Sequence, residues 1–149
     1  MKSYLFKLSL SLLLFITASF FCAAQTADDI KFEKETQKFK KVDEGHQLTF
    51  KYVFSYSGKE DLTIIEPKVD CSCTEVILPE EKIESNKTYT IIIKFDTHDK
   101  IGWQERKVNI QFVSNSMDSK AIEKTLIFKG MIKASKATKE SYKANQKRK

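Results

Sequence analysis

The feature that most constrains this chain is an alternation of apolar and polar residues with a period of two. From His46 to Tyr56, aromatic and aliphatic side chains occupy every second position, and mostly polar side chains lie between them. This period is typical of a β-strand that buries one face. The pattern recurs in three further segments, whose apolar positions are Tyr89, Ile91, Ile93 and Phe95; Val108, Ile110 and Phe112; and Ile122, Leu126 and Phe128.

Shorter strands are predicted between these segments, separated by turn residues. The shorter segments are Ile30–Phe32, Lys38–Val42, Leu62–Ile65 and Thr74–Leu78. The turns are marked by Glu44-Gly45, Ser57-Gly58, Ser85-Asn86 and Ser114-Asn115, which are residue types that favour turns. No stretch has a sustained helical period. The pattern therefore predicts an all-β fold, an immunoglobulin-like sandwich of about seven strands over residues 25–132.

Residues 1–24 are typical of a secretory signal peptide. Lys2 and Lys7 accompany an apolar run from Leu8 to Phe21, and Cys22-Ala23-Ala24 supplies small residues before a cleavage site. We expect cleavage before Gln25, which yields an exported, soluble protein of the periplasm or the cell surface. No later apolar run reaches 18 residues, so the mature chain is expected to have no membrane span.

Two alternatives to cleavage involve the same segment. A retained membrane anchor is disfavoured because the apolar run of 14 residues is short for the roughly 20 residues that a span requires. Lipidation at Cys22 is disfavoured because Phe20 and Phe21 are bulky for the small-residue positions of a lipoprotein signal. Export by cleavage is the favoured interpretation.

The net charge of +6 is concentrated at the C-terminus. Residues 133–149 carry seven basic side chains against Glu140 alone, whereas the mature chain before them has 17 basic and 19 acidic residues. This tail has no apolar stripe, so we predict that it is disordered or weakly helical. It is either solvated or in contact with an anionic surface of the cell envelope. Nucleic acid is not an expected partner, because basic and aromatic residues are not interleaved.

Cys71-x-Cys73 is the one group of residues that could carry chemistry. Cleavage of the signal peptide removes Cys22, so these two cysteines are the ones that remain in the mature chain. In an extended strand the two Cα atoms would be about 6.6 Å apart, so the backbone must bend to close a disulfide. We expect a disulfide formed in this way to be strained and therefore easily reduced. Three interpretations stay open: a structural or inert pair, a thiol-redox pair, or a Cu(I) site. Two ligands are too few for a zinc site.

The remaining candidate residues have simpler interpretations. His46 and His98 are predicted to be surface residues, and His98 completes a metal site only if its loop lies beside Cys71. Trp103 is predicted to be a core or strand-entry aromatic, with an exposed contact for a partner as the alternative. No motif for a cofactor or a catalytic set is present.

Several of these landmarks occur in an order that resembles a known family. They are Ser57-Gly58, Asp61-Leu62-Thr63-Ile64, Cys71-Ser72-Cys73-Thr74, Phe95-Asp96-Thr97, Gly102-Trp103, Ser114-Asn115 and Leu126-x-Phe128-x-Gly130. Over residues 30–132 the chain resembles the bacterial exported family of domain of unknown function 1573. The departures are Ser72 in place of Gly, Tyr56 in place of Asn, and Ser85-Asn86 in place of Pro-Gly.

The resemblance implies an immunoglobulin-like fold akin to major-sperm-protein and hydin-type domains, and an exported location, but no activity. We therefore predict a binding or structural module that is not an enzyme. It is expected to contact another envelope protein through sandwich edges or loops, for instance by strand addition. The alternative function is a thiol-redox or copper-handling protein that acts through Cys71 and Cys73. No cofactor is predicted.

Overall fold

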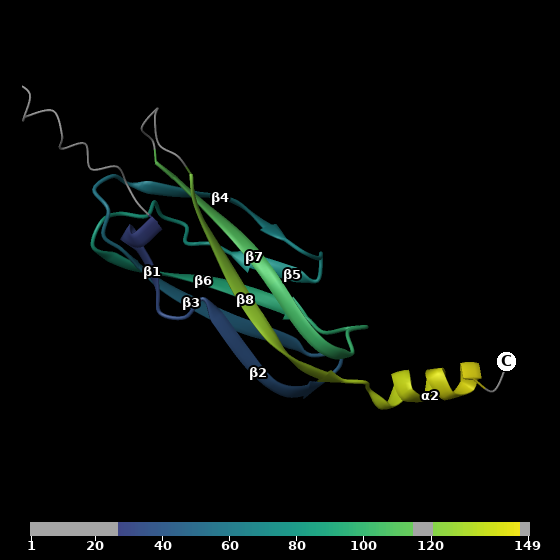
Figure 1. Ribbon diagram of the computed structural model, residues 1–149. Helices are drawn as coiled ribbons and strands as arrows, with labels where there is room; N and C mark the ends of the chain where they lie inside the picture. Colours follow the sequence, from purple (N-terminus) through teal and green to yellow (C-terminus); the bar gives the residue numbers. More distant parts are fainter. Residues whose placement is uncertain (1–26, 115–120, 147–149) are drawn as a thin grey trace, which may run out of the picture.

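The computed structural model describes residues 27–114 and 121–146. Eight strands form two four-stranded sheets, ordered β1-β3-β6-β5 and β2-β8-β7-β4, which pack face to face (Figure 1). After a 3-10 turn, η2 (Ala27–Asp29), the strands are β1 (Ile30–Phe32), β2 (Thr36–Asp43), β3 (Gln47–Tyr56), β4 (Leu62–Val69), β5 (Thr74–Ile77), β6 (Lys87–Asp96), β7 (Gly102–Ser114) and β8 (Ile122–Lys133). The all-β sandwich is confirmed, with eight strands instead of about seven.

The apolar positions of the alternating segments face the space between the sheets. On β3, Phe50, Tyr52, Phe54 and Tyr56 are buried, and most of the alternate residues of β6, β7 and β8 are buried opposite or beside them. Aromatic rings interlock across the two layers: Phe50 stacks on Phe128 at 4.7 Å between ring centroids, and Phe54 meets Phe112 edge-on at 5.4 Å. The apolar residues at alternate positions of the strands therefore pack into a single core that is rich in aromatic rings.

One buried hydrogen bond also joins the two sheets. The Tyr52 hydroxyl on β3 donates to the Ile127 carbonyl on β8 at 2.7 Å. Burial raises the pKa of the Tyr52 phenol above its ordinary value, so the phenol stays protonated as a donor at neutral pH. The bond satisfies a polar group that burial would otherwise leave without a partner.

Gly130 allows β2 to lie close against β8. The two strands run parallel, with Phe39 opposite Gly130, and their register shifts between Phe39 and Val42. A Cβ atom at position 130 would lie 2.5 Å from the Phe39 carbonyl oxygen. A larger residue would therefore push the edge strand away from the sheet.

The predicted turns agree with the structure where it describes them. Gly45 has a φ of 89° between β2 and β3, and Asn86 has a φ of 59° before β6. Asn tolerates the left-handed conformation better than most residues, which explains why Ser85-Asn86 can form this turn without a glycine. Asn115 lies outside the described residues, as does the predicted signal peptide.

The segment predicted to be disordered or weakly helical contains a helix, α2 (Lys136–Gln146), which projects from one end of the sandwich (Figure 1). Ser135 caps it, because its hydroxyl accepts the Thr138 N–H at 3.1 Å. Glu44, in the β2–β3 turn, accepts hydrogen bonds from the Ser135 N–H at 2.9 Å and the Thr138 hydroxyl at 2.6 Å. The Ser135 bond, followed by that of Thr138, lowers the Glu44 pKa. The cap and Glu44 thus fix the start of a helix that lacks an apolar face.

Replacing Phe50 tests the assignment of the inner face. Phe50→Ala removes a ring between the sheets, and we expect the free energy of unfolding to fall by about 3–5 kcal/mol. Lys51→Ala changes an exposed neighbour and should alter it by no more than about 0.5 kcal/mol. Chemical denaturation of both variants measures the difference, and equal losses would show that the assigned register is wrong.

Deleting residues 136–149 tests whether α2 contributes to the fold. Because the described side chains of α2 make no apolar contact with the core, we expect the midpoint of thermal unfolding to stay nearly unchanged. Far-UV circular dichroism should lose only its helical part. A drop of several degrees in the midpoint would contradict this expectation.

Candidate functional site

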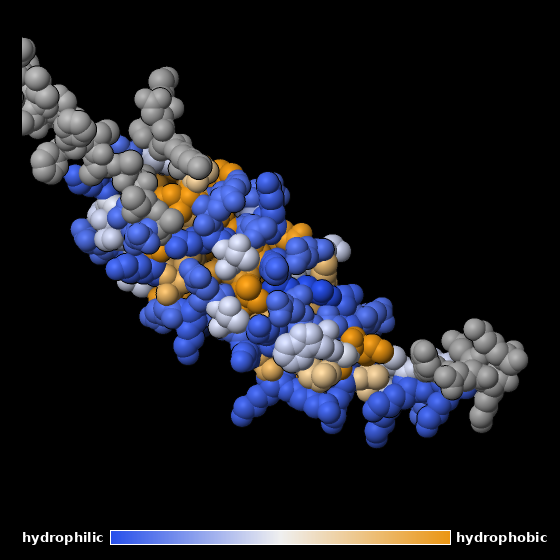
Figure 2. Space-filling view, viewed as in Figure 1, coloured by the Kyte–Doolittle hydropathy of each residue, from blue (hydrophilic) through white to orange (hydrophobic). Residues whose placement is uncertain are grey.

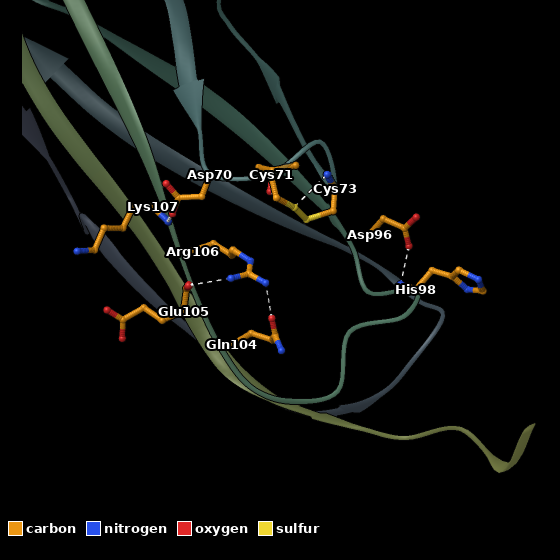
Figure 3. Close-up of a disulfide and its surroundings, with 10 residues drawn as sticks. Asp70, Cys71, Cys73, Asp96, His98, Gln104, Glu105, Arg106 and Lys107 are labelled. Atoms are coloured by element: carbon orange, nitrogen blue, oxygen red, sulfur yellow. Dashed lines mark hydrogen bonds between the residues drawn. A yellow bond between two sulfur atoms is a disulfide. The ribbon is translucent and has the colours of Figure 1, made fainter. Parts of the chain in front are cut away.

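The two cysteines lie in the short loop that joins β4 to β5, beside the end of β6 (Figure 3). They form a disulfide, and their Cα atoms are 5.2 Å apart, closer than in an extended strand. The Thr74 N–H donates to the Cys71 carbonyl at 3.1 Å, so the chain bends at this point. Ser72 does not have a positive φ, which shows that this bend does not require the glycine usual in the resembled family.

The two sulfur atoms have different surroundings. The Cys71 Sγ accepts a hydrogen bond from the Cys73 N–H at 3.1 Å, whereas Cys73 packs against the core with its Sγ 4.0 Å from the Thr74 hydroxyl. The start of the loop is held to β7, the neighbour of β4 in its own sheet, by Asp70, whose carboxylate accepts the Lys107 N–H at 3.1 Å. The disulfide thus occupies a braced corner of the sandwich.

An inward-facing arginine shares this corner. Arg106 follows the same alternation as buried Val108, and its guanidinium lies over the Phe95 ring with 5.9 Å between the guanidinium carbon and the ring centroid. It donates to the Gln104 side chain at 2.7 Å, and its Nε is buried without a hydrogen-bond partner among the described residues. The alternating pattern of Val108, extended by two residues toward the N-terminus, would have placed Arg106 on the inward face, but a charged side chain is not expected there.

The histidines do not join the cysteines. His46 and His98 are exposed, as predicted. The Asp96 N–H donates to the Cys73 carbonyl at 2.9 Å, so the His98 loop begins beside the disulfide, but the imidazole points away from it (Figure 3). In residues 27–114 and 121–146, no group of three or more His, Cys, Asp or Glu side chains is placed to hold a metal ion.

Trp103 occupies the strand-entry position that was predicted, but it is not part of the core. It is the second residue of β7 and is 59% exposed. The odd-numbered residues of β7 face outward, and buried Gln104 takes the inward position instead. The core interpretation is therefore wrong, and the alternative of an exposed aromatic describes this side chain.

The disulfide loop connects two edge strands. Within the described part of the chain, β4 pairs only with β7, apart from a bridge between Leu62 and Ile83, and β5 pairs only with β6. Their outer edges are consequently free of a neighbouring strand. Ile65 and Val69 on β4 and Ile77 on β5 are each exposed by 37–38%. This side of the sandwich combines open backbone edges with exposed aliphatic side chains.

The landmarks of the family resemblance have structural roles. The buried Tyr56 ring lies where a Cβ of Gly58 would be, and its hydroxyl donates to the Glu60 carbonyl at 2.5 Å. Buried Thr97 exchanges hydrogen bonds with the backbone of His46, which ties the end of β6 to the start of β3. These residues determine the fold, so the motif they form carries no catalytic information.

No helix in the described ranges is long and apolar enough to cross a membrane. Residues 1–26, which include Cys22, lie outside those ranges.

Solved structures with similar folds have little sequence identity. The ASH/PapD-like domain 7 of human CEP192 has a TM-score of 0.58 at 10% identity, over 77% of this chain and 93% of that one. The periplasmic chaperone SfaE has a TM-score of 0.52 at 11% identity, over 69% and 57%. The Vibrio cholerae protease VesB has a TM-score of 0.57 at 6% identity, over 70% of this chain, which spans about a third (32%) of VesB. These likenesses concern the fold alone.

A comparison with curated proteins finds no match. A family model described as protein of unknown function DUF1573 matches residues 30–132, from the first strand to the end of the last. The chain belongs to the DUF1573 family.

Proposed function

We propose that this protein is an exported, non-catalytic binding module that contacts another protein of the cell envelope through the β4 edge of its sandwich. The observation that carries the proposal is the outer edge of β4, which beyond the bridge from Leu62 to Ile83 has no neighbouring strand in the described residues, and which displays Ile65 and Val69. Free strand edges accept an extended segment of a partner by backbone hydrogen bonding. The PapD-like fold supports the proposal by analogy.

The other edges of the sandwich suit this role less well. β1 has three residues and β5 has four, which leaves little length for pairing. β2 displays lysines at positions 38, 40 and 41 and has an irregular register, features that protect an edge from association. On β4, Pro67 and the register shift after Ile65 interrupt pairing, so we place the contact at Thr63–Ile65.

Location at the envelope depends on the predicted signal peptide. Residues 1–24 have the charge, apolar run and small residues of a cleavable signal. The family resemblance favours the same compartment. We therefore propose the periplasm or the cell surface as the place where the β4 edge meets its partner.

A second candidate function is thiol-disulfide exchange at Cys71 and Cys73. The favouring observation is the N–H of Cys73, which already donates to the Cys71 sulfur. After reduction, the same donor would stabilise a thiolate at Cys71 and make it the more reactive sulfur. The step is a two-electron reduction of the disulfide to two thiols, with a donor thiol such as glutathione oxidised to its own disulfide. The reduced pair offers two soft ligands to Cu(I).

Photo-crosslinking in the producing cell tests the binding proposal. A photoreactive amino acid at Ile65 is expected to give an adduct with one envelope protein, because this side chain lies at the proposed contact. The same probe at Lys31, an exposed residue of β1, is the matched control and should give none. Thr63→Lys, which places a charge on an exposed residue within the proposed contact, should weaken the Ile65 adduct. Equal adducts at Ile65 and Lys31, or no effect of Thr63→Lys, would contradict a β4 contact.

Alkylation and unfolding of the cysteine variants test the second function. If the pair is redox-active, free thiols appear under mild glutathione and are detected by mass after alkylation, and Cys71→Ser should remove the faster-reacting thiol. The double Ser variant should lose little stability, because a loop with one intervening residue yields far less than the ~3 kcal/mol of a 15-residue loop. If the disulfide resists glutathione, the double Ser variant is as stable as the unmodified protein and no copper binds, the redox, copper-binding and structural interpretations of the pair are excluded. Only the binding module would then remain.

A further inference from the structure

An exposed apolar cluster lies at the end of the sandwich from which α2 projects. Trp103 pairs with Met131 across β7 and β8 on the outer face of the sheet, and Ile101 precedes them. Their exposed fractions are 59%, 38% and 49%. Figure 2 shows apolar residues gathered at this end, next to α2. Three large apolar side chains in one place exceed the scattered exposure of an ordinary surface.

Basic side chains follow this cluster along the chain. β8 ends at Lys133, and α2 begins three residues later with Lys136, where Lys136, Lys139 and Lys143 are exposed. Their spacing of three and four residues places them along one stripe of the helix. Glu140 is the single acid of the helix, and the chain continues with Lys147, Arg148 and Lys149.

The neighbouring part of the same sheet is basic as well. Lys38 on β2 lies opposite Lys129 on β8 in the register, and Lys40 and Lys41 follow on β2. Among the acids, Asp43 on β2 lies opposite Lys133 in the register, Glu105 is paired with Lys129 at 3.4 Å, and Glu44 is engaged by Ser135 and Thr138. The bonds of Glu44 fix the root of α2 to the β2–β3 turn, close to where the apolar cluster ends.

We propose that this end of the molecule, defined by Ile101, Trp103, Met131 and the lysines of α2, binds the surface of a bilayer that contains anionic lipids. Tryptophan is the residue most typical of the membrane–water interface. Clustered lysines beside it add electrostatic attraction to anionic headgroups. The surface lies apart from the β4 edge, so this inference goes beyond the proposed protein contact and does not rest on it.

The chemistry favours a lipid surface over a protein partner. Only three large apolar side chains lie here and lysines surround them, whereas the buried centre of a protein interface is depleted in charged residues. A projecting helix with one-sided positive charge and no apolar stripe cannot form the packed centre of such an interface. It can lie along a negatively charged plane while Trp103 inserts among the headgroups. The protein would thereby be held at the membrane while β4 stays accessible.

The single tryptophan of the chain reports directly on this contact. The mature protein from Gln25 is mixed with vesicles of phosphatidylcholine, with or without phosphatidylglycerol, and followed by sedimentation and tryptophan emission. Binding is expected only with phosphatidylglycerol, weaker at high salt, with a blue shift of the emission and quenching by brominated lipid. Replacing Lys136, Lys139 and Lys143 with Gln should weaken binding on the order of a hundredfold.

A matched variant separates this site from general charge. Gln at Lys31, Lys51 and Lys59 removes the same charge from β1, β3 and the β3–β4 turn, and should leave vesicle binding nearly unchanged. Trp103→Ala should weaken sedimentation while the far-UV spectrum stays native. The proposal is overturned by equal loss in both triple variants, by sedimentation without a change in emission, or by no binding. A concentration-dependent blue shift without vesicles would instead identify a second copy as the occupant.

Discussion

The structure depends on the contact between the inner faces of its two sheets, which is made largely by aromatic rings. Phe50 and Phe54 of β3 reach Phe128 and Phe112 of the opposite sheet, and the Tyr52 hydroxyl bonds to the β8 backbone. Large rings bury much apolar area per residue and have few rotamers, so the two layers are held with little loss of side-chain entropy. With the faces joined in this way, strand edges and connecting loops are left for contacts with other molecules.

Three such places lie on the perimeter and differ in chemistry. The β4 edge offers backbone groups and aliphatic side chains, the β4–β5 loop holds the disulfide beside Arg106, and the α2 end combines Trp103 with lysines. Hydrogen bonds attach two of these places to the sandwich: Asp70 holds the β4–β5 loop, and Glu44 holds the start of α2. Each place can therefore act on a partner while the core stays unchanged.

Several residues by which the chain resembles the DUF1573 family help to build this fold. Thr97 ties two strand ends together, Gly130 admits the close approach of β2, and Gly58 makes room for the Tyr56 ring. These roles are steric or hydrogen-bonding and would be the same whatever the protein binds. Solved structures at 6–11% identity resemble this chain in fold alone and carry no argument about activity.

The sequence by itself determined the strands and their buried faces, because these follow from local periodicity and turn chemistry. It also placed a turn at Ser85-Asn86, where Asn86 has a positive φ. Only the tertiary structure decided that Trp103 faces outward, that Arg106 shares a corner with the disulfide, and that Glu44 holds the start of α2. Each of these depends on residues distant along the chain, since Met131 borders Trp103 and Ser135 meets Glu44 only when the sheets are paired. Local pattern determines which face of a strand is apolar, whereas the partner across that face is set by strand order and register.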